Sequence, residues 1–284
     1  MQQSDISRRV REHIATLPLT MRRVAQYMEQ NRVEVVARSA AELGATLETS
    51  DATVVRTAKA LGYAGLADLK RCLTRELSNG TPVDNFQRTL RVAGADARKA
   101  ALRSVEAAQT ATVALCQPEM LDRIQRVIDL LHCARGIVLF GIGPTAHLAG
   151  YMAFQLRRLG RSVLVVDATG RGIADAMLEV GPGDAVLLMS YGRPYPEVLT
   201  VVEDALMQSL PIVLITNTSD TPLARKVQEM IVLSRGGAHG MALGASSFIC
   251  LEALIVGLSV CAPEETRTRL SRLEQLRASI DRLG

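Results

Sequence analysis

One short segment carries side chains suited to reading the edges of DNA base pairs. Residues 50–61 show helical spacing, with Val54, Ala58 and Leu61 on one apolar face. The opposite face carries a small residue, a hydroxyl group and two cations, which suit a helix that lies in a DNA major groove. The residues that we predict to contact DNA are Ser50, Ala52, Thr53, Arg56 and Lys59.

Three loops farther along the chain carry a different set of polar groups. In residues 141–149, two glycines let the backbone approach a ligand closely, and a hydroxyl and the N–H groups behind it face a bound anion. Residues 190–198 offer a hydroxyl, a forked cation and a phenol, and residues 235–240 add an imidazole. The residues that we predict to bind a small ligand are Gly141, Gly143, Thr145, Ser190, Arg193, Tyr195 and His239.

Other interpretations of these loops stay open. Residues 141–149 also fit a strand-to-helix turn without a ligand, since such turns need glycine. The spacing G-x-G-x-x-A in residues 141–146, with Asp167 after the next strand, satisfies a dinucleotide-binding pattern as well. His239 and His147 fit ordinary polar loop positions, because no histidine is spaced for pairing with a carboxylate or a nucleophile.

Capping signals predict the helices that position the DNA-reading residues. The Ser50 hydroxyl can accept from first-turn N–H groups, and Gly62 suits the position just after a helix. The preceding helix is predicted to run from Ser39 to Leu47, with Glu42 at capping-box spacing. The two helices together predict a helix-turn-helix.

The second part of the chain has the pattern of an α/β domain. From about residue 119, helical segments alternate with short apolar runs, which fit strands buried on both faces of a parallel sheet. The predicted strands are 136–140, 162–166, 185–190, 212–216 and 230–234. Ligands bind beyond the carboxyl ends of such strands, which is where the ligand loops begin. The predicted fold is an all-α helix-turn-helix domain followed by a three-layer α/β domain with a five-stranded parallel sheet.

The predicted domain organisation has three parts. Residues 1–78 form the helix-turn-helix domain, 79–115 a linker and a connector helix, and 116–284 the ligand-binding domain with a C-terminal helix. The helix over 96–115 is either a connector or a helix packed on the second domain. The final helix, over 264–283, carries an apolar stripe that docks either on the sheet or on a second subunit.

Composition narrows the class of protein. An aromatic share of 3%, without Trp, argues against stacking platforms for single-stranded nucleic acid. Residues 1–78 hold 12 Lys and Arg against 9 Asp and Glu, an excess that favours phosphate contacts. Five scattered cysteines predict a reducing cytoplasm with neither disulfides nor a zinc site, and no cofactor is expected. Residues 241–262 have the length of a membrane span, but Glu252 in their middle favours a buried helix.

Residues 50–70 contain three motifs in order: S-x-x-T-V-x-R, L-G-Y-x-G and D-L-K. The matching residues are Ser50, Thr53, Val54, Arg56, Leu61, Gly62, Tyr63, Gly65, Asp68, Leu69 and Lys70. With this combination the chain resembles the RpiR family of bacterial transcription regulators. These join an N-terminal helix-turn-helix domain to a C-terminal SIS (sugar isomerase) domain, so the resemblance implies a metabolite-responsive DNA-binding protein.

The chain departs from the family pattern in its turn and in its first ligand loop. Where the family has L-A before the turn and G-V inside it, this chain has Leu43-Gly44 and then Glu48-Thr49. Glu48 adopts the left-handed backbone of a turn glycine less readily, which questions the turn geometry. In the first loop, which the family writes G-x-G-x-S, Thr145 replaces Ser.

The second ligand loop departs further from the family motif S-x-S-G-x-T-x-E. Ser190 and Glu197 match, so the resemblance adds Glu197 to the predicted ligand-binding residues. Gly192, Arg193 and Tyr195 stand where the family has Ser, Gly and Thr, which removes two hydroxyls. Hydrogen bonds to an anion contribute about 1.5–3 kcal/mol each, so weak phosphosugar binding is predicted. Either Arg193 substitutes as a charged clamp, or the ligand lacks a phosphate.

The leading hypothesis is a DNA-binding transcription regulator, not an enzyme, whose operator binding is modulated by a small anionic metabolite such as a sugar phosphate or a related acid. A homodimer or homotetramer is expected, because helix-turn-helix proteins read half-sites about 34 Å apart. One alternative is a sugar-phosphate isomerase-type SIS enzyme. Another is an NAD(P)-sensing regulator, motivated by Gly141, Gly143 and Asp167.

Overall fold

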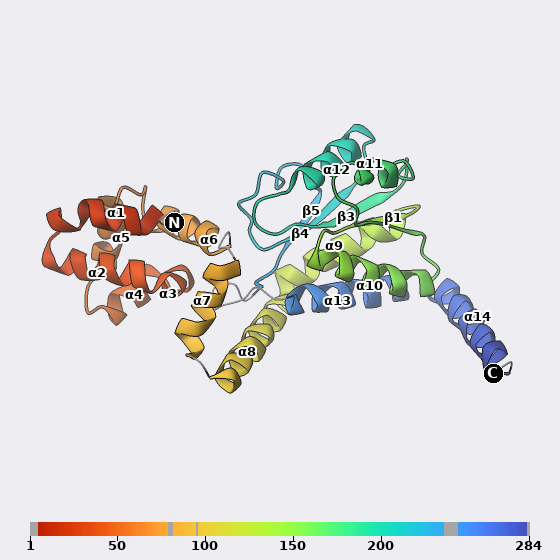
Figure 1. The fold of residues 1–284 in the computed structure, drawn as a ribbon, viewed down its shortest axis with the longest axis horizontal. Helices are drawn as coiled ribbons and strands as arrows, with labels where there is room; N and C mark the ends of the chain where they lie inside the picture. Colours follow the sequence, from red (N-terminus) through yellow and green to blue (C-terminus); the bar gives the residue numbers. More distant parts are fainter. Residues whose placement is uncertain (1–4, 79–81, 95, 236–243, 283–284) are drawn as a thin grey trace. The chain divides into compact units, whose positions relative to one another are not determined.

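The computed structural model describes residues 5–78, 82–94, 96–235 and 244–282 (Figure 1). These residues form two compact units, one ending at Val92 and the other beginning at Ala93. Each unit has its own buried core of apolar side chains.

The first unit is all-helical, as predicted. Its elements are α1 (Asp5–His13), the 3-10 helix η1 (Ile14–Thr16), α2 (Leu19–Gln30), α3 (Arg32–Ala37), α4 (Ala40–Thr46), α5 (Asp51–Ala60), α6 (Leu66–Ser78) and most of α7 (Pro82–Ala93). The predicted apolar face of residues 50–61 lies in the core, because Val54, Ala58 and Leu61 are fully buried.

The helices α4 and α5 begin at the predicted caps. Ser39 Oγ accepts from the Glu42 N–H at 3.2 Å, and Glu42 Oε2 accepts from the Ser39 N–H at 2.7 Å, which closes the capping box. The hydrogen bonds with Ser39 lower the pKa of Glu42, so the carboxylate stays charged at neutral pH. At α5, Ser50 Oγ accepts from the Thr53 N–H at 3.2 Å.

The end of α5 is a Schellman motif. The Gly62 N–H donates to Lys59 O at 2.9 Å, and the Tyr63 N–H donates to Ala58 O at 3.2 Å. Gly62 has φ +83°, a left-handed backbone that glycine adopts without steric cost. The predicted role of Gly62 just after the helix is confirmed.

The end of α4 repeats this arrangement without a glycine. The Glu48 N–H donates to Ala45 O at 3.3 Å, and the Thr49 N–H donates to Gly44 O at 2.9 Å. Glu48 has φ +50°, so it adopts the left-handed backbone that its side chain disfavours by about 1–2 kcal/mol. The turn between the two helices is therefore retained although the turn glycine is absent.

The second unit is an α/β domain. Its elements are α8 (Ala97–Leu115), α9 (Pro118–Cys133), β1 (Ile137–Phe140), α10 (Pro144–Arg158), β2 (Val163–Val166), α11 (Gly172–Met177), β3 (Ala185–Met189), α12 (Pro196–Met207), β4 (Ile212–Thr216), β5 (Glu229–Val232), α13 (Ala245–Cys261) and α14 (Pro263–Asp281). All five strands are parallel, in the order β2-β1-β3-β4-β5, which confirms the predicted sheet. β5 ends earlier than predicted, because its pairing with β4 stops where Thr216 meets Val232.

Helices cover both faces of this sheet and make three layers (Figure 1). Residues of α9, α10 and α13 share one buried cluster with one side of the strands, and the end of α8 joins this layer through Leu115. Residues of α11 and α12 share a second cluster with the other side. Along β1, for example, Leu139 lies in the first cluster and Phe140 in the second. The alternation explains why β1, β2 and β3 are apolar at every position.

The apolar segment before the C-terminus forms the helix α13, which is buried on one face as predicted, whereas Val256 and Val260 on it are 61% and 69% exposed. Along α13, Cys250, Leu251 and Leu254 are fully buried, and the Glu252 carboxylate accepts a hydrogen bond from the Tyr151 hydroxyl. Among the described residues, no single helix is long and apolar enough to cross a membrane; α13 and α14 together reach that length and composition, with a bend of 104° between them. The apolar stripe predicted for the last helix lies on α14, which has no buried residue.

Relief of the backbone strain at Glu48 is expected to stabilise the helical unit. Glu48→Gly removes a left-handed cost of about 1–2 kcal/mol but adds unfolded-state entropy of about 0.4–1 kcal/mol, for a net gain of about 0.5 kcal/mol. The matched variant Glu48→Ala removes the same charge and keeps a Cβ atom. The stability of both variants is measured by urea unfolding, with a signal that follows the helical unit. If Glu48→Gly were no more stable than Glu48→Ala, the result would contradict this account.

Candidate DNA-reading helix and ligand loops

The exposed face of α5 carries the predicted DNA-contacting residues. Ser50, Ala52, Arg56 and Lys59 are exposed, and Thr53 is half-buried. Arg56 Nη2 donates to Thr53 Oγ1 at 3.2 Å, which brings the guanidinium back toward the start of the helix. This end of a recognition helix is the one that meets base edges in helix-turn-helix complexes.

Gly44 lets α4 lie close to the turn that leads into α5. A Cβ atom at this position would lie 2.8 Å from Thr49 O and 3.1 Å from the Asp51 backbone nitrogen. These neighbours are backbone atoms that cannot give way cheaply. The glycine that departs from the family pattern therefore permits the close contact between α4 and the turn.

The first ligand loop is held by its own hydroxyl group. Thr145 Oγ1 accepts from the Ile142 N–H and donates to Ile142 O, both at 2.9 Å, and Thr145 is buried. A Cβ atom at Gly141 would lie 2.5 Å from Thr145 O, so only glycine fits there. Gly143 has φ +60° and faces open space. The Thr145 hydroxyl thus already has two partners within the loop, whereas the backbone at Gly143 is open to a ligand.

The second ligand loop leaves several polar groups uncommitted. Ser190 is 7% exposed, and within the described part of the chain its hydroxyl makes no hydrogen bond. The Gly192 N–H donates to Asn217 Oδ1 at 3.0 Å, which ties the loop to the end of β4. Arg193 is exposed and has no ion pair with any described residue. Tyr195 is 62% exposed at the start of α12.

Glu197 connects two loops at this edge of the sheet. Its Oε1 accepts from the Gly170 N–H at 3.1 Å, between β2 and α11. Backbone hydrogen bonds from Gly170 and from Glu197 itself lower the pKa of Glu197 and keep it ionised at neutral pH. The structure therefore gives Glu197 a role in joining loops, whatever it does for a ligand.

A cluster around Tyr191, which lies in the second ligand loop, was not among the predicted site residues. The Tyr191 hydroxyl shares a hydrogen bond of 2.6 Å with Ser247 Oγ, and Arg235 lies over the Tyr191 ring at 4.0 Å. Burial raises the pKa of Tyr191 and lowers that of Arg235. The predicted ligand residue His239, four positions after Arg235, lies outside the described residues. Nothing in the sequence pairs Tyr191 with Ser247, because 56 positions separate them.

Strand order brings the two ligand loops together. β1 lies between β2 and β3, so the chain leaves β1 through α10 toward one side of the sheet and leaves β3 through α12 on the other. Phe140 and Leu188 are register partners near the carboxyl ends of these adjacent strands. This is a topological switch point, the usual ligand position in open parallel sheets.

The two units define a class of protein: a helix-turn-helix domain joined to a sugar-isomerase-type sheet domain. A family model described as "Helix-turn-helix domain, rpiR family" matches residues 5–80, and a SIS domain model matches residues 130–256. The chain therefore belongs to the RpiR family, and the resemblance seen in residues 50–70 is confirmed.

Curated relatives include the "Bifunctional protein glk" of Paraburkholderia xenovorans, which is 27% identical over 223 residues. The match covers 78% of this chain and 34% of that protein. The relative of the same name from Burkholderia thailandensis is 26% identical, with the same coverage. This chain thus spans about a third of the length of those relatives.

Two solved structures share the fold. The Vibrio vulnificus NanR protein complexed with ManNAc-6P has a TM-score of 0.57 and 22% identity, and the match covers 97% of this chain and 98% of that chain. The sugar isomerase domain of an RpiR transcription factor from Sphaerobacter thermophilus has a TM-score of 0.50 and 19% identity, with 68% and 94% covered.

The Thr145 hydroxyl is expected to stabilise the first ligand loop. Thr145→Val keeps the side-chain shape but leaves the Ile142 N–H and C=O without this partner, at a cost of about 1–3 kcal/mol. Thr145→Ser keeps the hydroxyl and is the matched control. In urea unfolding of the full chain, equal stability of the Val and Ser variants would show that these hydrogen bonds contribute little.

Proposed function

We propose that this chain is a transcription regulator that binds double-stranded DNA through α5. The observation that carries the proposal is the exposed pair Arg56 and Lys59 on a helix whose opposite face is fully buried. An arginine at such a position can donate two hydrogen bonds to guanine, and a lysine can neutralise a phosphate. The match of residues 5–80 to an rpiR-family helix-turn-helix model supports this assignment.

The ligand loops are proposed to bind a small anionic metabolite. Backbone N–H groups at the start of α10, the Ser190 hydroxyl and the Arg193 guanidinium are the groups proposed to meet it. NanR, which shares the fold, was solved with ManNAc-6P, and this supports a sugar phosphate or a related acid as the ligand class. Loss of two family hydroxyls shifts recognition toward Arg193. No catalytic step is proposed.

The ligand is proposed to act by shifting a population. A metabolite that binds one arrangement of the subunits more tightly than another changes the fraction of protein able to bind DNA. A homodimer or homotetramer is proposed, because paired helices then read paired half-sites about 34 Å apart.

Substitution of Arg56 tests the DNA-reading assignment. DNA is first selected from a random-sequence pool with the full chain, and binding is then measured by fluorescence anisotropy. Arg56→Ala is expected to weaken binding about tenfold or more, the loss of one well-aligned base contact. The matched control is Arg103→Ala, since Arg103 is exposed on α8 and pairs at 2.9 Å with Glu106 in the same helix. Undiminished binding by Arg56→Ala would reject α5 as the reading helix.

Substitution of Arg193 tests the ligand assignment. Isothermal titration compares hexose 6-phosphates and sugar acids with the same sugars lacking the acidic group. Binding of the anionic compounds alone is expected, and Arg193→Gln should weaken it about tenfold, as the loss of a charged hydrogen bond does. Arg225→Gln, an exposed arginine after β4, is the control. Equal binding of the uncharged sugars would contradict the proposed ligand class.

A further inference from the structure

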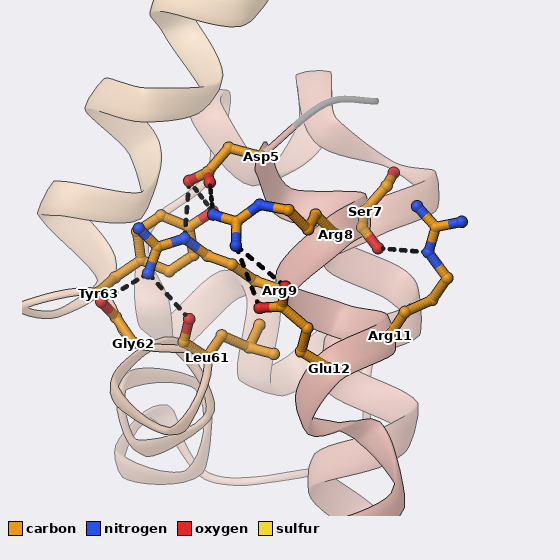
Figure 2. Close-up of polar contacts among 9 residues, drawn as sticks. All are labelled: Asp5, Ser7, Arg8, Arg9, Arg11, Glu12, Leu61, Gly62 and Tyr63. Carbon is orange, nitrogen blue, oxygen red and sulfur yellow. Dashed lines mark hydrogen bonds and ion pairs between the residues drawn. The ribbon is translucent and has the colours of Figure 1, made fainter. Parts of the chain in front are cut away.

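We infer that Arg9, on α1, is a positioning residue for DNA reading because it fixes the C-terminal end of α5. The inference rests on the proposed function of α5 and concerns a residue outside its exposed face. Figure 2 shows Arg9 between its own helix and the segment that follows α5.

Arg9 donates to the carbonyl groups at the end of α5. Its Nη1 atom lies 2.8 Å from Gly62 O and 3.3 Å from Leu61 O (Figure 2). The last carbonyls of a helix have no partner within the helix and carry its negative dipole end. A guanidinium there satisfies the carbonyl of the C-cap residue Leu61 and that of Gly62, the residue after it, and places a positive charge where the helix dipole favours one.

The guanidinium is itself held from two further sides. Arg9 Nε donates to Asp5 Oδ2 at 2.7 Å, and the guanidinium carbon lies 4.4 Å from the centre of the Tyr63 ring. The Tyr63 hydroxyl donates to the same Asp5 oxygen at 3.3 Å, which closes a ring of contacts. Burial alone would raise the pKa of Asp5, but hydrogen bonds from Arg8 and Arg9 outweigh it and lower the pKa.

Gly62 gives an independent indication that Arg9 is fitted to this position. A Cβ atom on Gly62 would lie 2.8 Å from Arg9 Nη1, so a side chain at this position would make the end of Arg9 shift away from its place. Arg9 is only 28% exposed, although arginine is usually a surface residue. The contact therefore depends on the glycine after α5 as well as on Arg9.

The position of this end of α5 matters for reading bases. A helix of this length spans about 15 Å, so a tilt at its C-terminal end moves the side chains that meet the DNA. Bidentate contacts to a base tolerate displacements of only about 0.5 Å. The buried face of α5 restrains its rotation, and Arg9 adds a polar contact at its far end.

Arg9→Lys keeps the positive charge but removes the forked donor that reaches Asp5 and both carbonyls at once. Arg8→Lys is the matched control, because Arg8 is the adjacent residue and its described partners, Asp5 and Glu12, lie on α1. Ile6→Val is the stability control, since it weakens the same core and removes none of the groups that hydrogen-bond with Arg9. All variants are made in the full chain and assayed below their unfolding temperatures on the DNA selected by wild type.

Arg9→Lys is expected to lose about tenfold in affinity for the selected DNA, with affinity for a scrambled duplex and the salt dependence both unchanged. Arg8→Lys and Ile6→Val should bind both duplexes like wild type. Wild-type affinity of Arg9→Lys for the selected DNA, or an equal loss on the scrambled duplex, would overturn the inference. The inference would also be overturned if Ile6→Val, at an equal loss of stability, weakened binding to the selected DNA as much as Arg9→Lys does. If wild type selected no sequence, the proposed function would fail and the inference with it.

Discussion

The ends of helices and strands leave backbone N–H and C=O groups that the elements cannot satisfy themselves, and this constraint shapes both candidate sites. Ser39 and Ser50 supply acceptors at the starts of α4 and α5. Arg9 supplies a donor at the end of α5, and Arg161 does the same for α9 by donating to Leu131 O and His132 O. The helix α5, which carries the exposed DNA-reading side chains, is therefore held by side chains at both ends as well as through its apolar face.

The same constraint decides which side chains of the ligand loops remain available. Thr145 satisfies the backbone of Ile142, and Glu197 satisfies that of Gly170. Their polar groups hold the loops in shape before any ligand arrives. Ser190 and Arg193 have no such partner among the described residues, and they are therefore the groups that we propose for ligand recognition, together with the backbone near Gly143.

Sequence patterns predicted much of the fold because the relevant forces are local or periodic. The buried positions Val54 and Ala58 follow from helical spacing, and the five strands follow from apolar runs between turns. The inward direction of the Thr145 hydroxyl could not be predicted, since a hydroxyl at this position serves a ligand or a loop equally well. Arg9 was missed because its carbonyl partners lie 52 and 53 positions away. A contact of that separation has no signature in local spacing.

Charge links the altered second loop to the class of ligand that we propose. Neutral hydroxyl donors recognise an anion without adding net charge to the site. Arg193 adds a positive charge, and no described carboxylate neutralises it. The nearest loop carboxylate in sequence, Glu197, already accepts from the Gly170 N–H and does not pair with Arg193. An uncharged sugar would leave the Arg193 charge uncompensated in the bound state, while an acidic group would offset it. Because Arg193 is exposed, such an interaction is screened by salt, so a ligand held this way should bind more weakly as ionic strength rises.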